Sequence, residues 1–149
     1  MLTRISLIVA ISLTSAACSP SSQSGVPVAP GDDKVVFTGD QKADWGQIGA
    51  LEDQAKAILK VSGCGSAAEC RTAPVGSRAC GGPRYYLVYC AKTTDSAALF
   101  RKLDAIAAAE REFNQRYGLV STCEFRMPPN VALIAGSCLQ TEQQTQQVP

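Results

Sequence analysis

Residues 84–118 read RYYLVYCAKTTDSAALFRKLDAIAAAEREFNQRYG, and this stretch combines a strand pattern with a helix pattern. Aromatic and branched side chains dominate residues 84–90, which favours a β-strand. The alanine-rich stretch that follows predicts a helix over residues 96–117, with Thr94 or Asp95 as its N-cap. Apolar side chains recur on one face of this helix, which is therefore expected to pack against the strand.

A second amphipathic helix and a partner strand precede this stretch. From Trp45 onward, apolar side chains recur at helical spacing, which predicts a helix from Asp44, with a capping-box-like start, to about Lys60. Residues 71–75 are expected to form a shorter strand that pairs with residues 84–90.

Two further extended segments, residues 122–127 and 131–139, flank the Pro-Pro-Asn motif at 128–130 and predict a hairpin. The expected order is helix, strand, strand, helix, strand, strand. This order indicates an α+β fold, in which a small antiparallel β-sheet of about four strands packs with one face against both α-helices.

The cysteines suggest how the domain is stabilised. Setting the first cysteine aside, the remaining six are even in number, which indicates three disulfides in an exported protein. Histidine is absent and no pair has C-x-x-C spacing, so neither a metal site nor a redox centre is expected. The chain contains seven cysteines: Cys18, Cys64, Cys70, Cys80, Cys90, Cys123 and Cys138.

The hairpin prediction supports one disulfide directly, because it places Cys123 opposite Cys138. For the other four cysteines we favour bonds between sequence neighbours. A Cys70 to Cys90 bond, across a hairpin centred near Cys80, is the alternative. The favoured pairings are thus Cys123 with Cys138, Cys64 with Cys70, and Cys80 with Cys90.

The amino-terminal residues have the pattern of an export signal. Arg4 supplies a positive start, residues 5–13 form an apolar run, and small residues follow. The run is shorter than the roughly 20 residues needed to cross a bilayer. The sequence Ser-Ala-Ala-Cys at residues 15–18 resembles the lipobox of bacterial lipoprotein precursors.

This resemblance implies that a diacylglyceryl group is attached to the Cys18 sulfur and that cleavage leaves Cys18 amino-terminal, so that lipid holds the protein on a membrane. Ser19, where aspartate would favour inner-membrane retention, implies the outer membrane, facing the periplasm. Ser15 occupies the place where leucine is commonest in lipoboxes, and Ser15 with Ala17 also fits ordinary secretory cleavage. A soluble secreted protein is therefore the alternative.

Four segments follow from these patterns. They are a signal peptide at residues 1–17, a lipid-anchored flexible linker at 18–39, one disulfide-stapled domain at 40–139, and a disordered Gln- and Thr-rich tail at 140–149.

Charge excludes one class of partner. The chain has 14 Lys and Arg against 13 Asp and Glu, without a block of like charge. Nucleic-acid binding depends on clustered positive charge that displaces counterions, so no nucleic-acid partner is expected.

Two features are candidates for ligand binding. Gly81 and Gly82 permit unusual backbone conformations, and the neighbouring Arg84 would complete a site for a carboxylate or a sulfate. The favoured interpretation is instead a tight connection stapled by a disulfide.

Glu110 falls on the apolar face of the second helix, where a carboxylate needs a partner such as Arg84 or Arg71. A structural ion pair is the favoured interpretation there.

No motif identifies a reaction. Without histidine, Ser-His and Cys-His nucleophilic sites lack their base, and we assign no catalytic residue and no cofactor.

The leading hypothesis is a lipid-anchored interaction module of the cell envelope, without catalytic activity, that binds an unknown envelope protein or cell-wall partner. One version is an inhibitor of an envelope hydrolase. The alternative is an envelope enzyme with carboxylate or Ser-Lys chemistry, which a pocket gathering Glu110, Glu124 or Lys92 would favour.

Overall fold

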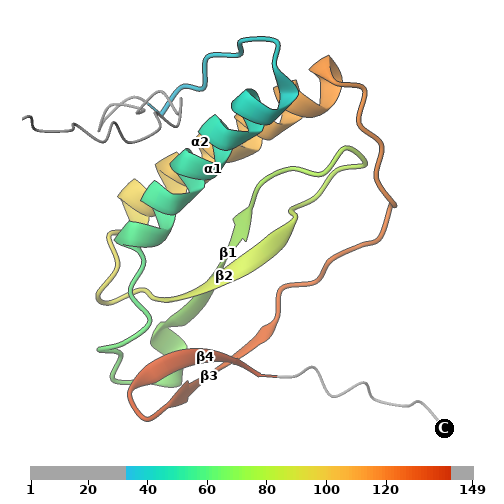
Figure 1. The fold of residues 1–149 in the computed structure, drawn as a ribbon. Coiled ribbons are helices and arrows are strands. Elements are labelled where there is room, and N and C mark those ends of the chain that lie inside the picture. Colours follow the sequence, from blue (N-terminus) through green and yellow to red (C-terminus); the bar gives the residue numbers. More distant parts are fainter. Residues whose placement is uncertain (1–32, 142–149) are drawn as a thin grey trace, which may run out of the picture.

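The computed structural model describes residues 33–141, so the predicted signal peptide, Cys18, most of the linker and most of the tail lie outside the described residues. The predicted order of helices and strands is confirmed (Figure 1). The elements are α1 (Gln41–Ile58), the short 3-10 helix η1 (Ala67–Glu69), β1 (Cys70–Val75), β2 (Tyr85–Cys90), α2 (Ser96–Arg116), β3 (Asn130–Ile134) and β4 (Ser137–Thr141).

The strands form two antiparallel sheets of two strands each, and the expectation of one four-stranded sheet is wrong in this respect. β1 pairs with β2, and β3 pairs with β4. The outer edge of β4 is occupied by residues 61–63, because Cys138 donates its amide to the Val61 carbonyl and Ser62 forms a bridge with Ser137. This pairing leaves β4 no free edge to join the β1–β2 sheet.

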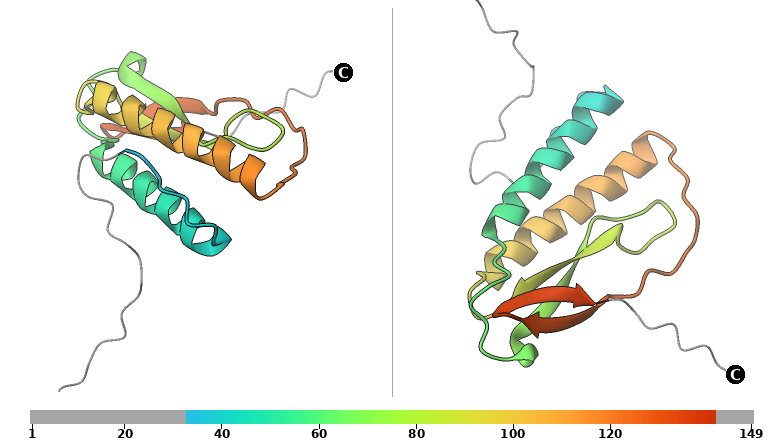
Figure 2. Two further views of the ribbon diagram at one scale, coloured as in Figure 1. Left: turned by 90° about the horizontal axis from the view of Figure 1, so that it is seen from above. Right: turned by 60° about the horizontal axis from the view of Figure 1, so that its bottom comes forward.

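The helices lie side by side, and α2 is the one that packs against β1 (Figure 2). α1 packs on α2 and reaches the β1–β2 sheet through side chains. The main core is formed by α1, α2, β1 and β2 together with Val35; its buried members are Val35, Ile48, Leu51, Ala55, Ala73, Val75, Tyr89, Leu99, Leu103, Ile106, Ala109 and Phe113.

The first helix begins three residues earlier than predicted. Asp40 is its N-cap, since the Asp40 side chain accepts the amide of Ala43 at 2.8 Å. Asp44 instead lies buried in the first turn and accepts hydrogen bonds from Thr38 and the Tyr117 hydroxyl. Although burial opposes ionisation, these bonds lower the pKa of Asp44 to about 2.

The second helix follows the sequence pattern closely. Of the two predicted N-caps, Asp95 caps α2 by accepting the Ala98 amide at 2.9 Å. Thr94 bonds to the main chain of Lys60 instead. The helix ends at Arg116, and Gly118 adopts the left-handed conformation (φ 59°) that ends helices.

The last hairpin turns at a different place from the one predicted. Its turn is Ala135-Gly136, where both residues have positive φ, as a two-residue hairpin turn of the primed type requires. The prolines at 128 and 129 cannot make this turn, because the proline ring holds φ near −65°. Residues 122–127, predicted to be a strand, form neither strand nor helix.

Three disulfides are present among the six predicted cysteines, but every favoured pairing is wrong. Cys70 and Cys90 do lie opposite each other in the β1–β2 register, as the alternative hairpin implied, yet they are not bonded to each other. The misplaced turn explains the error at Cys123, which lies outside the hairpin and cannot face Cys138. The bonds are Cys64–Cys90, Cys70–Cys138 and Cys80–Cys123, with Cα–Cα distances of 5.7, 5.4 and 5.3 Å.

This connectivity is directly testable. Digestion of the oxidised protein without reduction, followed by mass spectrometry, should recover Cys80 linked to Cys123 and Cys70 linked to Cys138. The sample should contain no free thiol at these positions. A peptide joining Cys123 to Cys138 would contradict the β3–β4 register.

Candidate functional site

Arg84 stands at the junction of α1, α2 and β2, where it pairs with two carboxylates. Its Nε lies 2.8 Å from Oε1 of Glu110 on α2, and its Nη2 bonds to Glu52 on α1. Glu52 also accepts from Lys56 at 2.6 Å and from the Tyr85 hydroxyl. Of the two predicted partners for Glu110, Arg84 is therefore the one that pairs with it.

Glu110 is closely packed as well as paired. Its side chain is 1% exposed, and its second oxygen accepts the Ser77 amide at 2.7 Å. Gly76, the residue before Ser77, has a positive φ of 73°, and a Cβ added there would lie 2.7 Å from Cδ of Glu110. A glycine is therefore required at this position both by the backbone conformation and by the carboxylate beside it.

The two glutamates that share Arg84 have opposite pKa shifts. Burial opposes ionisation of Glu52, but hydrogen bonds from Lys56, Tyr85 and Arg84 lower its pKa to about 2. Burial raises the pKa of Glu110 above its ordinary value, although the Ser77 amide and Arg84 oppose that shift. Glu110 is the more deeply buried of the two, which accounts for the difference.

Arg84 lies near aromatic rings as well as carboxylates, and its side chain is 28% exposed. Besides the two carboxylates, its guanidinium lies 5.4 Å from the ring centroids of Trp45 and Tyr85. Its Nε and Nη2 are thus occupied by carboxylates of the protein. Gly81 and Gly82 both adopt positive φ in a tight connection between β1 and β2, held by Arg78 and stapled by Cys80–Cys123.

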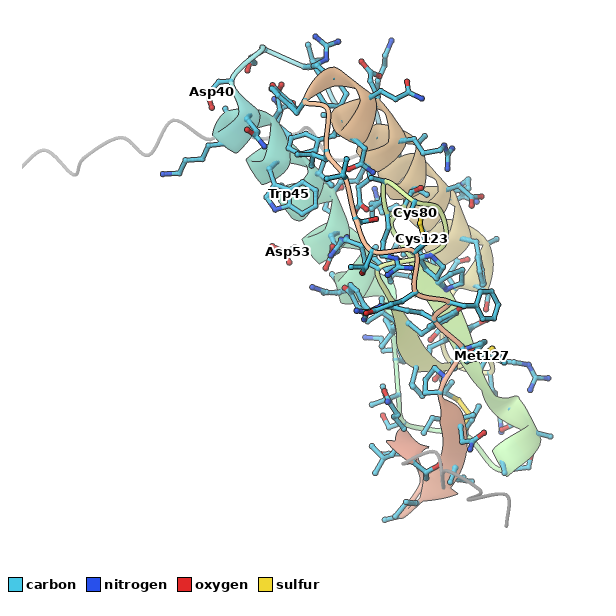
Figure 3. The ribbon with its side chains drawn as sticks, turned by 90° about the vertical axis from the view of Figure 1, so that its right-hand side faces the viewer. Asp40, Trp45, Asp53, Cys80, Cys123 and Met127 are labelled. Carbon is cyan, nitrogen blue, oxygen red and sulfur yellow. A yellow bond between two sulfur atoms is a disulfide. The ribbon has the colours of Figure 1, made fainter. Side chains whose placement is uncertain are left out.

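The surface feature that the sequence analysis missed is the connection between α2 and β3, residues 119–129. It runs as a stretched chain along one side of the molecule, past Cys80 (Figures 1 and 3). Val120 is 93% exposed, Phe125 86% and Met127 60%. The alternating apolar residues of this segment are a signal in the sequence, and they predict a strand that the structure does not form.

Several bonds attach this 119–129 segment to the body of the domain. Cys123 is bonded to Cys80, and the Ser121 hydroxyl accepts the Cys80 amide at 3.0 Å. Arg78 donates to the carbonyl of Glu124, and the Tyr86 hydroxyl donates to the carbonyl of Arg126 at 3.2 Å. The segment thus combines exposed apolar side chains with a backbone fixed at several points.

A groove of about 570 Å³ lies between the 119–129 segment, the start of β2 and the end of β4. Tyr85 and Tyr86 line one wall, and Phe125, Met127 and Pro129 line the other. Such an aromatic-rich lining resembles the central parts of protein interfaces, where Tyr, Phe and Met are enriched.

The residues named for the enzyme alternative are not gathered together. Glu110 is buried against the 76–77 backbone, and Glu124 belongs to the 119–129 segment. Lys92 lies near Glu69 beside Gly65, at the η1 end of the domain. Glu124 lines the surface hollows beside Phe125 without Glu110 or Lys92.

Four of the cysteines form a second, smaller core with Val88, Val131 and Leu133. The sulfurs of Cys64, Cys70 and Cys138 all lie within 4.8 Å of one another, a spacing that metal ligands would also have. Each of these sulfurs is engaged in a disulfide, so none is a thiolate, the form in which cysteine binds metals.

A comparison with known proteins finds no match to this chain among family models, curated proteins or solved structures. Within residues 33–141, neither helix has the length and apolar character of a membrane span. We therefore argue function from the side chains themselves.

The packing of Glu110 against Gly76 predicts a difference between two glycine variants. Gly81→Ala places a Cβ in open space at positive φ, so it should lower the free energy of unfolding by about 1 to 2 kcal/mol. Gly76→Ala meets the same backbone cost and also displaces the buried carboxylate, which should remove a further ~3 kcal/mol. Urea denaturation of the oxidised variants measures both. Equal losses would show that Glu110 does not pack against Gly76.

Proposed function

We propose that this protein is a lipid-anchored interaction module of the bacterial cell envelope, and that its binding surface is the 119–129 segment with the adjoining groove. The observation that carries the proposal is the exposure of Phe125, Val120 and Met127 on a backbone braced by the Cys80–Cys123 disulfide. Large apolar side chains gathered on a surface mark binding sites more often than isolated ones do.

Bracing makes this surface suitable for binding. A segment that is already ordered loses little conformational entropy when a partner is bound, so more of the contact energy appears as affinity. The disulfide and the bonds to the carbonyls of Glu124 and Arg126 order the chain on both sides of Phe125. Phe125 is therefore presented as an anchor side chain.

The backbone of the segment offers a second means of recognition. In a stretched chain, successive residues direct their amide and carbonyl groups to opposite sides. The carbonyls of Glu124 and Arg126 face the domain, since both accept hydrogen bonds from it. The backbone groups of Phe125, between them, face away and have no partner among the described residues. An extended partner strand can pair with such an edge.

An inhibitor of an envelope hydrolase is the specific form of this proposal. A braced, stretched segment with a projecting Phe125 has the shape of a peptide lying in an enzyme cleft. The rigidity that favours binding also restrains the segment from adapting to the cleft as a flexible substrate would.

The binding surface predicts which substitutions remove the partner. Bait carrying Phe125→Ser and Met127→Ser should no longer recover a stoichiometric partner from solubilised envelopes, because the apolar anchors are lost. Val36→Ser is the matched control, since Val36 is also exposed (66%) but lies outside the segment. Loss of the partner with Val36→Ser, or its retention with the double variant, would contradict the assignment. Unchanged melting temperatures for all three proteins would establish that folding is intact.

Attachment to the membrane is the other half of the proposal. The lipobox-like residues 15–18 would place two or three acyl chains at Cys18, enough for durable anchoring, and the outer membrane facing the periplasm follows from Ser19. The chain between Cys18 and Val35 would then tether the domain to that surface, because Val35 already belongs to the core.

The anchor makes a separate prediction. Cys18→Ser should abolish labelling by a fatty-acid analogue and block processing, whereas the unaltered mature protein should partition into the detergent phase. Cys64→Ser serves as the control, because it also removes one cysteine but leaves the lipobox unchanged. Labelling that persists in Cys18→Ser would refute lipidation at this residue. A cleaved, water-soluble product with an unmodified Cys18 would establish the secreted alternative.

A further inference from the structure

A second concave site lies on the α2 side of the 119–129 segment, apart from the groove beside Phe125. It encloses about 330 Å³ between the β1–β2 connection and the last turns of α2. Arg78 and Arg111 line it together with Ser77, Asn114, Gln115 and Leu119, and its lining contains no acidic residue. The pocket is therefore positively charged.

In the part of the chain that the structure describes, neither arginine is neutralised by a carboxylate. Within residues 33–141, no carboxylate lies at ion-pair distance from Arg78 or Arg111, although Arg84 and Arg116 each have such a partner. The Nε of Arg78 is buried and has no hydrogen-bond acceptor. Most buried donors in folded proteins are paired, because an unpaired one costs free energy. Arg78 thus brings to the pocket a positive charge that no carboxylate of residues 33–141 neutralises, and its buried Nε donates to no protein atom there.

The position of Arg78 is well defined. One of its terminal nitrogens donates to the Glu124 carbonyl, and its own backbone bonds to Gly81 and Gly82 in the tight connection. Arg111 approaches from α2, whose adjacent turn is fixed where the Asn114 amide donates to the Ser77 carbonyl at 2.8 Å. The two arginines therefore belong to separate elements that are bonded to each other.

An apolar site adjoins the cationic one. Leu119 lines both, and on its other side Trp45 and Phe113 line a mainly apolar hollow of about 420 Å³, whose lining also includes Gln41 and Lys42. Figure 3 shows Trp45 on the opposite side of the 119–129 segment from α2. A ligand that fits both sites carries an oxyanion next to an apolar group.

We propose that Arg78 and Arg111 bind the terminal carboxylate of a peptide whose last side chain is apolar and rests against Leu119, Trp45 and Phe113. Guanidinium groups match the planar carboxylate with paired hydrogen bonds, and capture of a carboxyl terminus is a known mode of peptide recognition. The site deepens the proposed function by giving the partner's chemistry, and it rests on the binding role but not on the role of Phe125.

The test uses small probes on the full oxidised chain. N-acetyl-leucine and its carboxamide differ only in the charged terminus, and titration of each, followed by NMR of the backbone amides and the arginine Nε groups, gives two affinities. We expect the acid to shift Arg78, Arg111 and Leu119 and to bind at least tenfold more tightly than the amide. Equal binding of acid and amide would overturn the proposal.

Arg111→Gln is the decisive variant, because Arg111 is exposed and has no ion-pair partner among residues 33–141 whose loss would disturb the fold. It should weaken acetyl-leucine about tenfold. Arg101→Gln makes the same charge change on the exposed surface of α2 outside the pocket and should leave affinity unchanged. Equal losses in both variants would indicate nonspecific attraction and overturn the site.

Two further probes separate the ligand classes. If inorganic phosphate binds more tightly than acetyl-leucine, the site does not select a carboxylate and the proposal is refuted. If octanoate binds more tightly than acetyl-leucine, the ligand is a fatty acid and the proposal of a peptide ligand is refuted. The Phe125→Ser, Met127→Ser protein distinguishes this site from the proposed function. It should still bind acetyl-leucine, so loss of envelope partner with retention of the probe would support both assignments separately.

Discussion

The architecture depends on a single guanidinium group, that of Arg84, which neutralises one carboxylate from each helix at the start of β2. Glu52 on α1 and Glu110 on α2 are both largely withdrawn from water, and each would be costly to bury without an opposite charge. Arg84 meets both at once, and Ser77 supplies the remaining hydrogen bond to Glu110. The two helices are thereby held at the same edge of the sheet, and Gly76 is required beside them. Arg84 acts here as a structural cation, and the proposed carboxylate site is formed by Arg78 and Arg111 instead.

The disulfides brace the parts of the chain that the main core does not reach. Cys64–Cys90 and Cys70–Cys138 join the end of the β1–β2 sheet to the segment before η1 and to β4, where few large apolar side chains are buried. A small domain buries a limited apolar area, and covalent links compensate for this. Cys80–Cys123 differs because it joins two exposed segments and holds a stretch of chain against the surface. Its effect is to order the proposed binding surface.

The two proposed sites share that stretch of chain. Residues 119–129 separate the groove beside Phe125 from the pocket of Arg78 and Arg111, and Arg78 itself bonds to the carbonyl of Glu124. Occupancy of the cationic pocket would thus act on a residue that also positions the exposed segment. An apolar anchor on one side and a carboxylate site on the other give a partner two points of contact, which favours specificity over either contact alone.

Sequence alone determined the elements whose signals are local. The strand at residues 85–90, the helix α2 and the involvement of six cysteines in disulfides follow from propensity, periodicity and parity, and they agree with the structure. Glu110 could likewise be recognised as needing an arginine, because its place on an apolar helix face is a local fact. Which cysteines pair was decided only by the tertiary structure, since the pairing depends on turn placement, and a turn at Ala135-Gly136 instead of the prolines moves Cys123 away from Cys138. The cationic pocket is also tertiary, because Arg78 and Arg111 are far apart in the chain and are brought together only when α2 packs against the β1–β2 connection.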